Sequence, residues 1–175
     1  LNHGNAPIST ATIPPLEILE AAYPVRFTQW AIRRDSGGPG RHRGGCGAVY
    51  EIELLEEQAD AFLFGERGKF SPPGIAGGLA GGLNRFTYPD GAEEVSPPMA
   101  SKMADIQLSK GQRVRLETPG GGGYGDPLKR EPTRVAKDVR LGYVSSAEAT
   151  EAYKCSVSEE GVLNIAETQK LRVGL

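Results

Sequence analysis

Four consecutive glycines at residues 120–123 restrict the possible folds of this chain more than any other feature. Glycine loses more backbone freedom on folding than other residues and has no side chain to pack, so the run suits neither a helix nor an ordinary strand. A strand pattern precedes it at residues 113–117, and helical periodicity begins only at Pro132. Such a run is expected to lie close to another group, either a ligand phosphate or another stretch of main chain.

The phosphate interpretation rests on spacing alone. Three glycines of this region fit the dinucleotide pattern G-x-G-x-x-G, but that pattern must open a helix whose N-terminus meets the pyrophosphate. Here six residues, 126–131, intervene before the helical pattern. An upstream match to the Walker pattern also fails, because Cys46 stands where lysine is required. These mismatches favour contact with other main chain over nucleotide binding.

Two further segments, residues 36–45 and 71–82, are also rich in glycine and proline. Proline favours the polyproline II conformation, whose main-chain donors and acceptors are left unpaired and must find partners when buried. We therefore expect the three glycine-rich segments to form a bundle of extended, polyproline-like rods joined by main-chain contacts. The alternative is three flexible surface loops, although loops so long and so poor in polar residues are uncommon.

Composition excludes several classes of protein. Glycine and proline, 24 and 13 of 175 residues, stay below the level typical of disorder. The formal net charge is −2, from 20 basic and 22 acidic residues that are well mixed, which argues against a nucleic-acid partner. No apolar run reaches the length needed to span a membrane. Cys46 and Cys155 form no C-x-x-C pair, so a reduced, cytoplasmic setting is expected.

Residues 1–117 are predicted to be mainly β after an opening arm. Residues 1–14 are expected to form an extended arm on a partner surface, and they resemble the interior of a longer polypeptide more than its start. Pro14 and Pro15 then favour a short helix at residues 16–22. Strands are predicted at residues 25–33, 48–55, 60–64, 85–88, 93–95, 101–108 and 113–117. The strand at 60–64 is apolar on both faces and is expected to be buried.

The region after the tetraglycine is predicted to be helical. Residues 132–141 form a helix that Gly142 ends, Ser145 begins a second helix through a capping box, and Asn164 caps a third. A small hairpin is expected at residues 155–163. The fold class is therefore mainly β with an α appendage: an antiparallel barrel or sandwich that runs into the glycine-rich bundle. We divide the chain into an arm with a short helix (1–24), a β domain (25–127) and a C-terminal helical segment (128–175).

The chain offers few residues for catalysis. His42 lies between Arg41 and Arg43 and has no carboxylate next to it in sequence, which favours a structural or surface role. His3 is expected to contribute at most one ligand to a metal that other residues hold. Arg41, Arg43 and Arg67 lie on glycine-flanked backbone, where a guanidinium suits a carboxylate or phosphate, although surface cations or ion pairs are the alternative.

The sequence resembles the hydantoinase B/oxoprolinase family. The residues that carry the resemblance are 15–25, 35–45, 72–78, 135–145 and, most specifically, 117–127. They occur in order along essentially the whole chain. Family members are longer, and this chain resembles only about their C-terminal third. The resemblance also implies β-sheets that run into polyproline-like segments.

The resemblance implies an activity that composition does not show. It implies ATP-dependent hydrolysis of cyclic amides such as hydantoins or 5-oxoproline, together with an ATP-binding hydantoinase A-like partner. A divalent metal would be held mainly outside this chain, with His3 as a candidate ligand, and ATP would bind the partner. Candidate catalytic residues facing the substrate are Arg41, His42, Arg67 and Lys102. The alternatives are a subunit of an acetone or acetophenone carboxylase, and a scaffold without catalytic residues.

Overall fold

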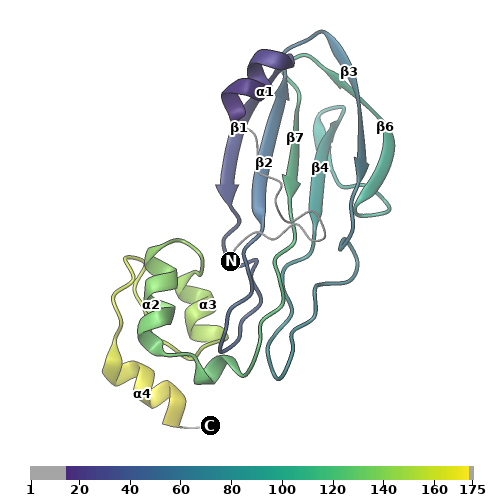
Figure 1. Cartoon of the computed structure of the whole chain (residues 1–175). Coiled ribbons are helices and arrows are strands. Elements are labelled where there is room, and N and C mark those ends of the chain that lie inside the picture. Colours follow the sequence, from purple (N-terminus) through teal and green to yellow (C-terminus); the bar gives the residue numbers. More distant parts are fainter. Residues whose placement is uncertain (1–14, 174–175) are drawn as a thin grey trace.

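Short alternating segments separated by turn residues fold into two antiparallel sheets in the computed structural model, which describes residues 15–173 (Figure 1). Helix α1 (Leu16–Ala22) follows its N-cap residue Pro15 and is followed by Tyr23 and Pro24. The remaining elements are β1 (Val25–Ile32), β2 (Ala48–Leu54), β3 (Gln58–Phe64), β4 (Arg85–Asp90), β5 (Glu93–Val95), β6 (Lys102–Ser109), β7 (Arg113–Glu117), η1 (Pro127–Lys129), α2 (Pro132–Arg140), α3 (Ser146–Glu151) and α4 (Ile165–Val173).

The larger sheet has five strands in the order β1-β2-β7-β4-β5, and the smaller one pairs β3 with β6. The two sheets pack face to face at a cluster built on Leu54, Phe86, Ile106 and Leu108. The predicted fold class, mainly β with antiparallel sheets and a C-terminal helical segment, is therefore confirmed. The expected barrel or sandwich is approximate, because the sheets of the described residues do not close into a barrel.

Strand β3 corrects one expectation from the sequence. Its small or aliphatic residues Ala59, Ala61 and Leu63 pack on the larger sheet, but Phe62 and Phe64 are each 82% exposed. Successive side chains of a strand point to opposite faces. The prediction that the strand is buried was wrong, because only one of its faces meets another layer in the part of the chain that the structure describes.

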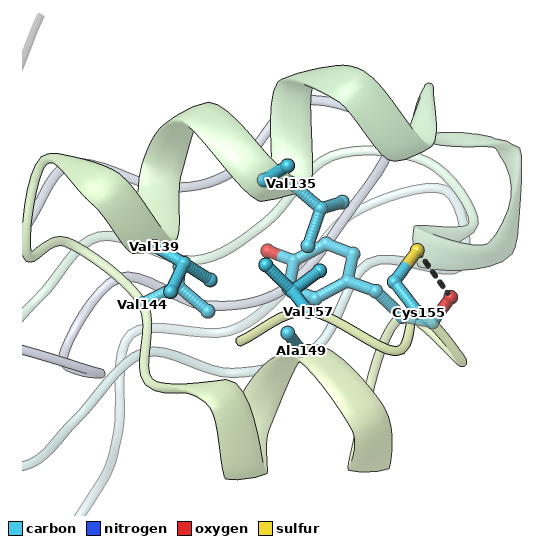
Figure 2. Close-up of a cluster of buried hydrophobic side chains, with 8 residues drawn as sticks. Val135, Val139, Val144, Ala149, Cys155 and Val157 are labelled. Atoms are coloured by element: carbon cyan, nitrogen blue, oxygen red, sulfur yellow. Dashed lines mark hydrogen bonds between the residues drawn. The ribbon is translucent and has the colours of Figure 1, made fainter. Parts of the chain in front are cut away.

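The C-terminal helices enclose a separate hydrophobic cluster. Val135 and Val139 of α2 face Ala149 of α3 across Val144 and Val157 (Figure 2). Gly142 ends α2 with a φ of 74°, as its position predicted. The predicted caps also form, since Ser145 Oγ accepts from Glu148 N at 3.0 Å. Asn164 Oδ1 likewise accepts from Glu167 N at 3.0 Å.

The small hairpin predicted at residues 155–163 forms around one antiparallel bridge between Val157 and Leu163. Ser158 N donates to Val162 O and Asn164 N to Ser156 O, each at 2.9 Å. The predicted N-terminal arm and His3 lie outside the described residues. Within residues 15–173, no helix is both long enough and apolar enough to cross a membrane.

Candidate functional site

The three glycine-rich segments lie side by side and extend from the end of the larger sheet toward the helices (Figure 1). The first and third segments are joined by Gly38 N to Gly121 O, at 2.8 Å, and by two bonds of 2.9 Å between His42 and Tyr124. The first and second segments are joined by Leu79 N to Pro39 O, at 2.7 Å. The predicted bundle of main chain is therefore confirmed, whereas the polyproline II conformation of its residues stays a prediction.

The third segment also bonds to the second, through Ile75 N to Gly123 O and Gly125 N to Ile75 O, each at 2.9 Å. The main-chain groups of the tetraglycine thus form hydrogen bonds with neighbouring main chain. A Cβ on Gly120 would overlap the carbonyl oxygen of Ser36, and one on Gly122 would overlap that of Pro73. Glycine is needed here because the segments approach more closely than any side chain allows.

Arg41 and His42 lie at the end of the bundle next to the C-terminal helices. Both side chains are exposed. The His42 ring lies 6.1 Å from the Tyr124 ring, between centroids, so its neighbour is aromatic. Arg130 Nη1 donates to the main-chain oxygen of Arg41 at 3.0 Å, which fixes the backbone there and leaves the Arg41 guanidinium in solvent. This pair can offer a guanidinium and an imidazole to a molecule bound outside the described residues.

Arg67 and Lys102 lie beside the ends of β3 and β6, where they line a pocket of about 470 Å³. Lys102 Nζ donates to Glu66 Oε1 at 2.8 Å, and this hydrogen bond lowers the pKa of Glu66 below its ordinary value. The same ammonium lies 5.0 Å from the centroid of the Phe64 ring. Arg67 has a φ of 66°, a conformation that non-glycine residues rarely adopt. The other lining residues are Gly65, Glu66, Gly68, Lys69, Phe70, Met99 and Ser101.

The four candidate catalytic residues therefore form two pairs. The pocket that contains Arg67 and Lys102 includes neither Arg41 nor His42. The sequence did not predict this division, because the bundle that separates the two ends exists only after folding. Among residues 15–173 no group of three His, Cys, Asp or Glu side chains is placed to hold a metal ion.

Arg43 has a structural partner, which fits the ion-pair alternative for the glycine-flanked arginines. Its Nε lies 3.2 Å from Asp138 Oδ2, and Arg130 Nη2 lies 2.7 Å from the same oxygen. All three side chains are about nine-tenths buried, at 9% to 10% exposure. The Arg43 guanidinium also lies 5.1 Å from the centroid of the Tyr143 ring. This cluster fastens α2 to the glycine-rich bundle.

Two buried groups beside this cluster are perturbed by their surroundings. The hydroxyl of Tyr153 has no hydrogen-bond partner among the described residues, and burial raises its pKa to about 12. Burial also raises the pKa of the Cys46 thiol, although Arg43 Nη1 donates to its sulfur at 3.1 Å. Both side chains are thus held neutral, as suits a packed interior.

Sequence reasoning missed a second charged region, on the outer face of the larger sheet. Glu117 bridges two arginines there, with Arg33 Nε 3.1 Å from Oε2 and Arg115 Nε 3.2 Å from Oε1. The alternation of Arg113, Arg115 and Glu117 along β7 was the available signal, because a period of two places all three on one face. Arg33 lies outside the strand pattern, so the sequence did not associate it with this face.

Comparisons with known proteins agree with this architecture. The family model described as hydantoinase B/oxoprolinase matches residues 1–127. The chain is 35% identical over 161 residues to the beta chain of the caprolactamase of Pseudomonas jessenii, covering 90% of this chain and 27% of that protein. It is 28% identical over 158 residues to the B component of a putative D-/L-hydantoinase of a Pseudomonas species, covering 90% and 26%.

Solved structures have the same fold. The ATP-dependent caprolactamase from Pseudomonas jessenii matches with a TM-score of 0.73 and 34% identity, over 91% of this chain and 28% of that chain. Nucleotide-free acetone carboxylase matches with a TM-score of 0.82 and 25% identity, over 95% and 26%. The chain spans about a quarter of the length of these relatives. With the family model covering most of its length, the chain belongs to the hydantoinase B/oxoprolinase family.

Proposed function

We propose that this chain is part of an ATP-dependent cyclic amide hydrolase of the hydantoinase/5-oxoprolinase type, and that it is inactive alone. The observation that carries the proposal is its 35% identity to the beta chain of a caprolactamase across nine-tenths of its length. The solved caprolactamase is described as ATP-dependent. ATP bound by a hydantoinase A-like partner would supply the phosphoryl group that activates the amide, a role that this chain does not perform.

The proposed contribution of this chain is a rigid scaffold with cationic side chains that face the substrate. Arg41 and His42 would act at one end of the bundle, and Arg67 and Lys102 in the pocket beside β3 and β6. Exposure of Arg41, His42 and Arg67 supports this role, because a contact with a bound molecule requires access. A divalent metal would be held mainly by other parts of the complex, with His3 as a candidate ligand outside the described residues.

The proposed partners follow from the same comparisons. An ATP-binding subunit and the remaining part of a hydantoinase B-like polypeptide would complete the enzyme, because the chain spans about a quarter of its relatives. Exposed apolar side chains offer them a surface: Phe62, Phe64, Phe70 and Met99 are 82%, 82%, 79% and 64% exposed. Large exposed apolar patches commonly mark protein interfaces. We place the complex in the cytoplasm, without nucleic-acid or membrane partners.

Acetone carboxylation is the second candidate, because the backbone overlaps acetone carboxylase with a TM-score of 0.82. The sequence favours the amide hydrolase, because its identity to caprolactamase is 34% and its identity to acetone carboxylase is 25%. A TM-score reports backbone shape, which related enzymes with different substrates share. The reconstituted complex should hydrolyse caprolactam, a hydantoin or 5-oxoproline with ATP. ATP-dependent carboxylation of acetone without amide hydrolysis would instead establish the second candidate.

A purely structural subunit is the alternative of a different class. Arg41→Ala and Arg67→Ala distinguish it, because both side chains are exposed and their loss leaves the fold intact. We expect either change to lower ATP-dependent turnover at least about tenfold in the assembled complex. Lys110→Ala, at an exposed ion pair with Glu57 away from both candidate regions, is the control. Unchanged turnover by both variants in an intact complex would establish scaffolding and reject the site.

A further inference from the structure

A second pocket, of about 680 Å³, lies where the outer face of the larger sheet meets the glycine-rich bundle. Its charged lining consists of four arginines and two carboxylates: Arg33, Arg34, Arg85, Arg115, Asp35 and Glu117. The chain as a whole carries a net charge of −2, so this excess of positive charge is local. A concave site with an excess of positive charge attracts small anions.

Glu117 cannot neutralise the arginines around it. It already pairs with Arg33 and with Arg115, one through each carboxylate oxygen. Arg85 lies directly opposite Glu117 in the register of β4 and β7. Its side chain nevertheless forms no ion pair with any residue in the described part of the chain. Arg115 also pairs with Glu51, at 3.3 Å, and Arg34 pairs with Glu159, at 3.1 Å. Among the described residues, Arg85 is therefore the guanidinium of this pocket that is left to meet another anion.

The arginine at the centre of this arrangement is fixed in place. Arg33 Nη1 donates to the main-chain oxygens of Leu83 and Thr118, at 2.5 and 3.0 Å. Its side chain is only 12% exposed. Burial lowers the pKa of Arg33, and the nearby charge of Arg85 lowers it further. A bound anion would offset this repulsion, and the central arginine of the wall is already held in place.

We propose that this pocket binds a small oxyanion, either the carboxylate or the phosphate group of a small molecule. Arg85 supplies the principal contact, and Arg33 and Arg115 set the positive charge of the wall. The planar guanidinium presents paired donors that match both groups in a bidentate geometry. The site lies on the outer face of the larger sheet, apart from the pocket of Arg67 and Lys102.

The test is titration of the 175-residue chain with glutarate and, separately, with inorganic phosphate at constant ionic strength, followed by calorimetry. We expect saturable binding of one ion per chain. Arg85→Ala should weaken it at least about tenfold, because a hydrogen bond to a charged group is lost. Arg113→Ala is the matched control, since Arg113 is 52% exposed on the same face and outside the pocket. It should change the affinity less than about twofold.

Glu117→Gln supplies a result of the opposite sign. Removing this carboxylate frees Arg33 Nε and leaves Arg115 with Glu51 as its ion-pair partner, so the affinity for the anion should increase. Tighter binding of glutarate than phosphate would identify a carboxylate site, and the reverse a phosphate site. Absence of saturable binding by the wild-type chain, or equal weakening by Arg85→Ala and Arg113→Ala, would overturn the proposal. Thermal unfolding of each variant verifies that it is folded. If Glu117→Gln does not fold, the comparison of Arg85→Ala with Arg113→Ala decides the test.

Discussion

At the scale of single residues, this protein depends on glycine as a way to bring main chain together. The consecutive glycines of the tetraglycine run do not have equal roles. A Cβ on Gly120 would overlap the carbonyl oxygen of Ser36, whereas one on Gly121 would lie 3.4 Å from its nearest neighbour, Gly45 N. The cost of a methyl group therefore depends on the position within the run.

Gly120→Ala should destabilise the protein by about 2 kcal/mol or more, because overpacking against fixed main chain forces the backbone to move. Gly121→Ala, one residue away, should cost less than about 1 kcal/mol. Urea unfolding followed by circular dichroism measures both free energies. Equal losses for the two variants would show that glycine is needed for flexibility in the run and not for close packing.

Tyr153 predicts a dependence of stability on pH. Its pKa is raised from 10.0 to about 12 in the folded protein, so its neutral form is favoured there. Below pH 10 the hydroxyl is protonated in both the folded and the unfolded state, so its contribution to stability is fully present. Between about pH 10 and 12 the hydroxyl ionises only in the unfolded chain, so stability falls by about 2 to 3 kcal/mol.

Tyr153→Phe should remove this part of the alkaline loss. At neutral pH it should change the free energy of unfolding by less than about 1 kcal/mol, because the hydroxyl it removes has no partner among the described residues. Urea unfolding at pH 8, 10 and 11.5 compares the two proteins, with Tyr124→Phe at the exposed end of the bundle as control. Curves that run parallel from pH 8 to 11.5 would contradict the assignment.

At the scale of elements, α2 is held to the bundle by charge as well as by packing. Asp138 of α2 forms ion pairs with Arg43, from the first glycine-rich segment, and with Arg130, which precedes the helix. The α2 face that carries Asp138 also buries Val135 and Val139. Helix and bundle therefore depend on one carboxylate.

Asp138→Asn should lower the free energy of unfolding by about 3 to 5 kcal/mol, because it leaves two buried arginines without a counter-charge. Glu167→Gln is the control. Its ion pair with Lys170 is exposed, at 46% and 75%, and should contribute less than about 1 kcal/mol. Chemical denaturation of the two variants measures the difference. Similar small losses would mean that the buried cluster is hydrated and does not fasten the helix.

At the scale of the whole molecule, the β3–β6 sheet is notable for the large apolar side chains that it leaves exposed. One face covers the larger sheet, while Phe62 and Phe64, at the alternate positions of β3, are each 82% exposed. A two-stranded sheet is only marginally stable without a neighbour. The proposed complex would use this face as an interface.

Phe62→Ser with Phe64→Ser should leave the chain folded, because neither ring is buried, and should weaken assembly of the reconstituted complex at least about tenfold. Met99, 64% exposed next to the Arg67 pocket, offers Met99→Ser as a smaller change at the same surface. Analytical ultracentrifugation measures assembly, and unfolding measures the fold. Unchanged assembly by the double variant would place the interface elsewhere.

Local signals in the sequence identified most elements of the fold. Every strand was expected near its observed position, and the caps at Ser145 and Asn164 form as their residue types predicted. The reason is that periodicity and capping depend on residues close in sequence. The buried strand at 60–64 was predicted wrongly, because its hydrophobicity does not reveal which neighbours are present. The proposed catalytic residues remain a prediction.

The sequence by itself predicted that three glycine-rich segments pair through their main chains, since glycine leaves no side chain between them and buried donors need partners. Only the tertiary structure decided which residues share a site. It left Arg41 and His42 outside the pocket that Arg67 and Lys102 line. It also gathered Arg33, Arg85 and Arg115 around Glu117. Such groupings join residues 30 to 84 positions apart, and sequence spacing carries no information about them.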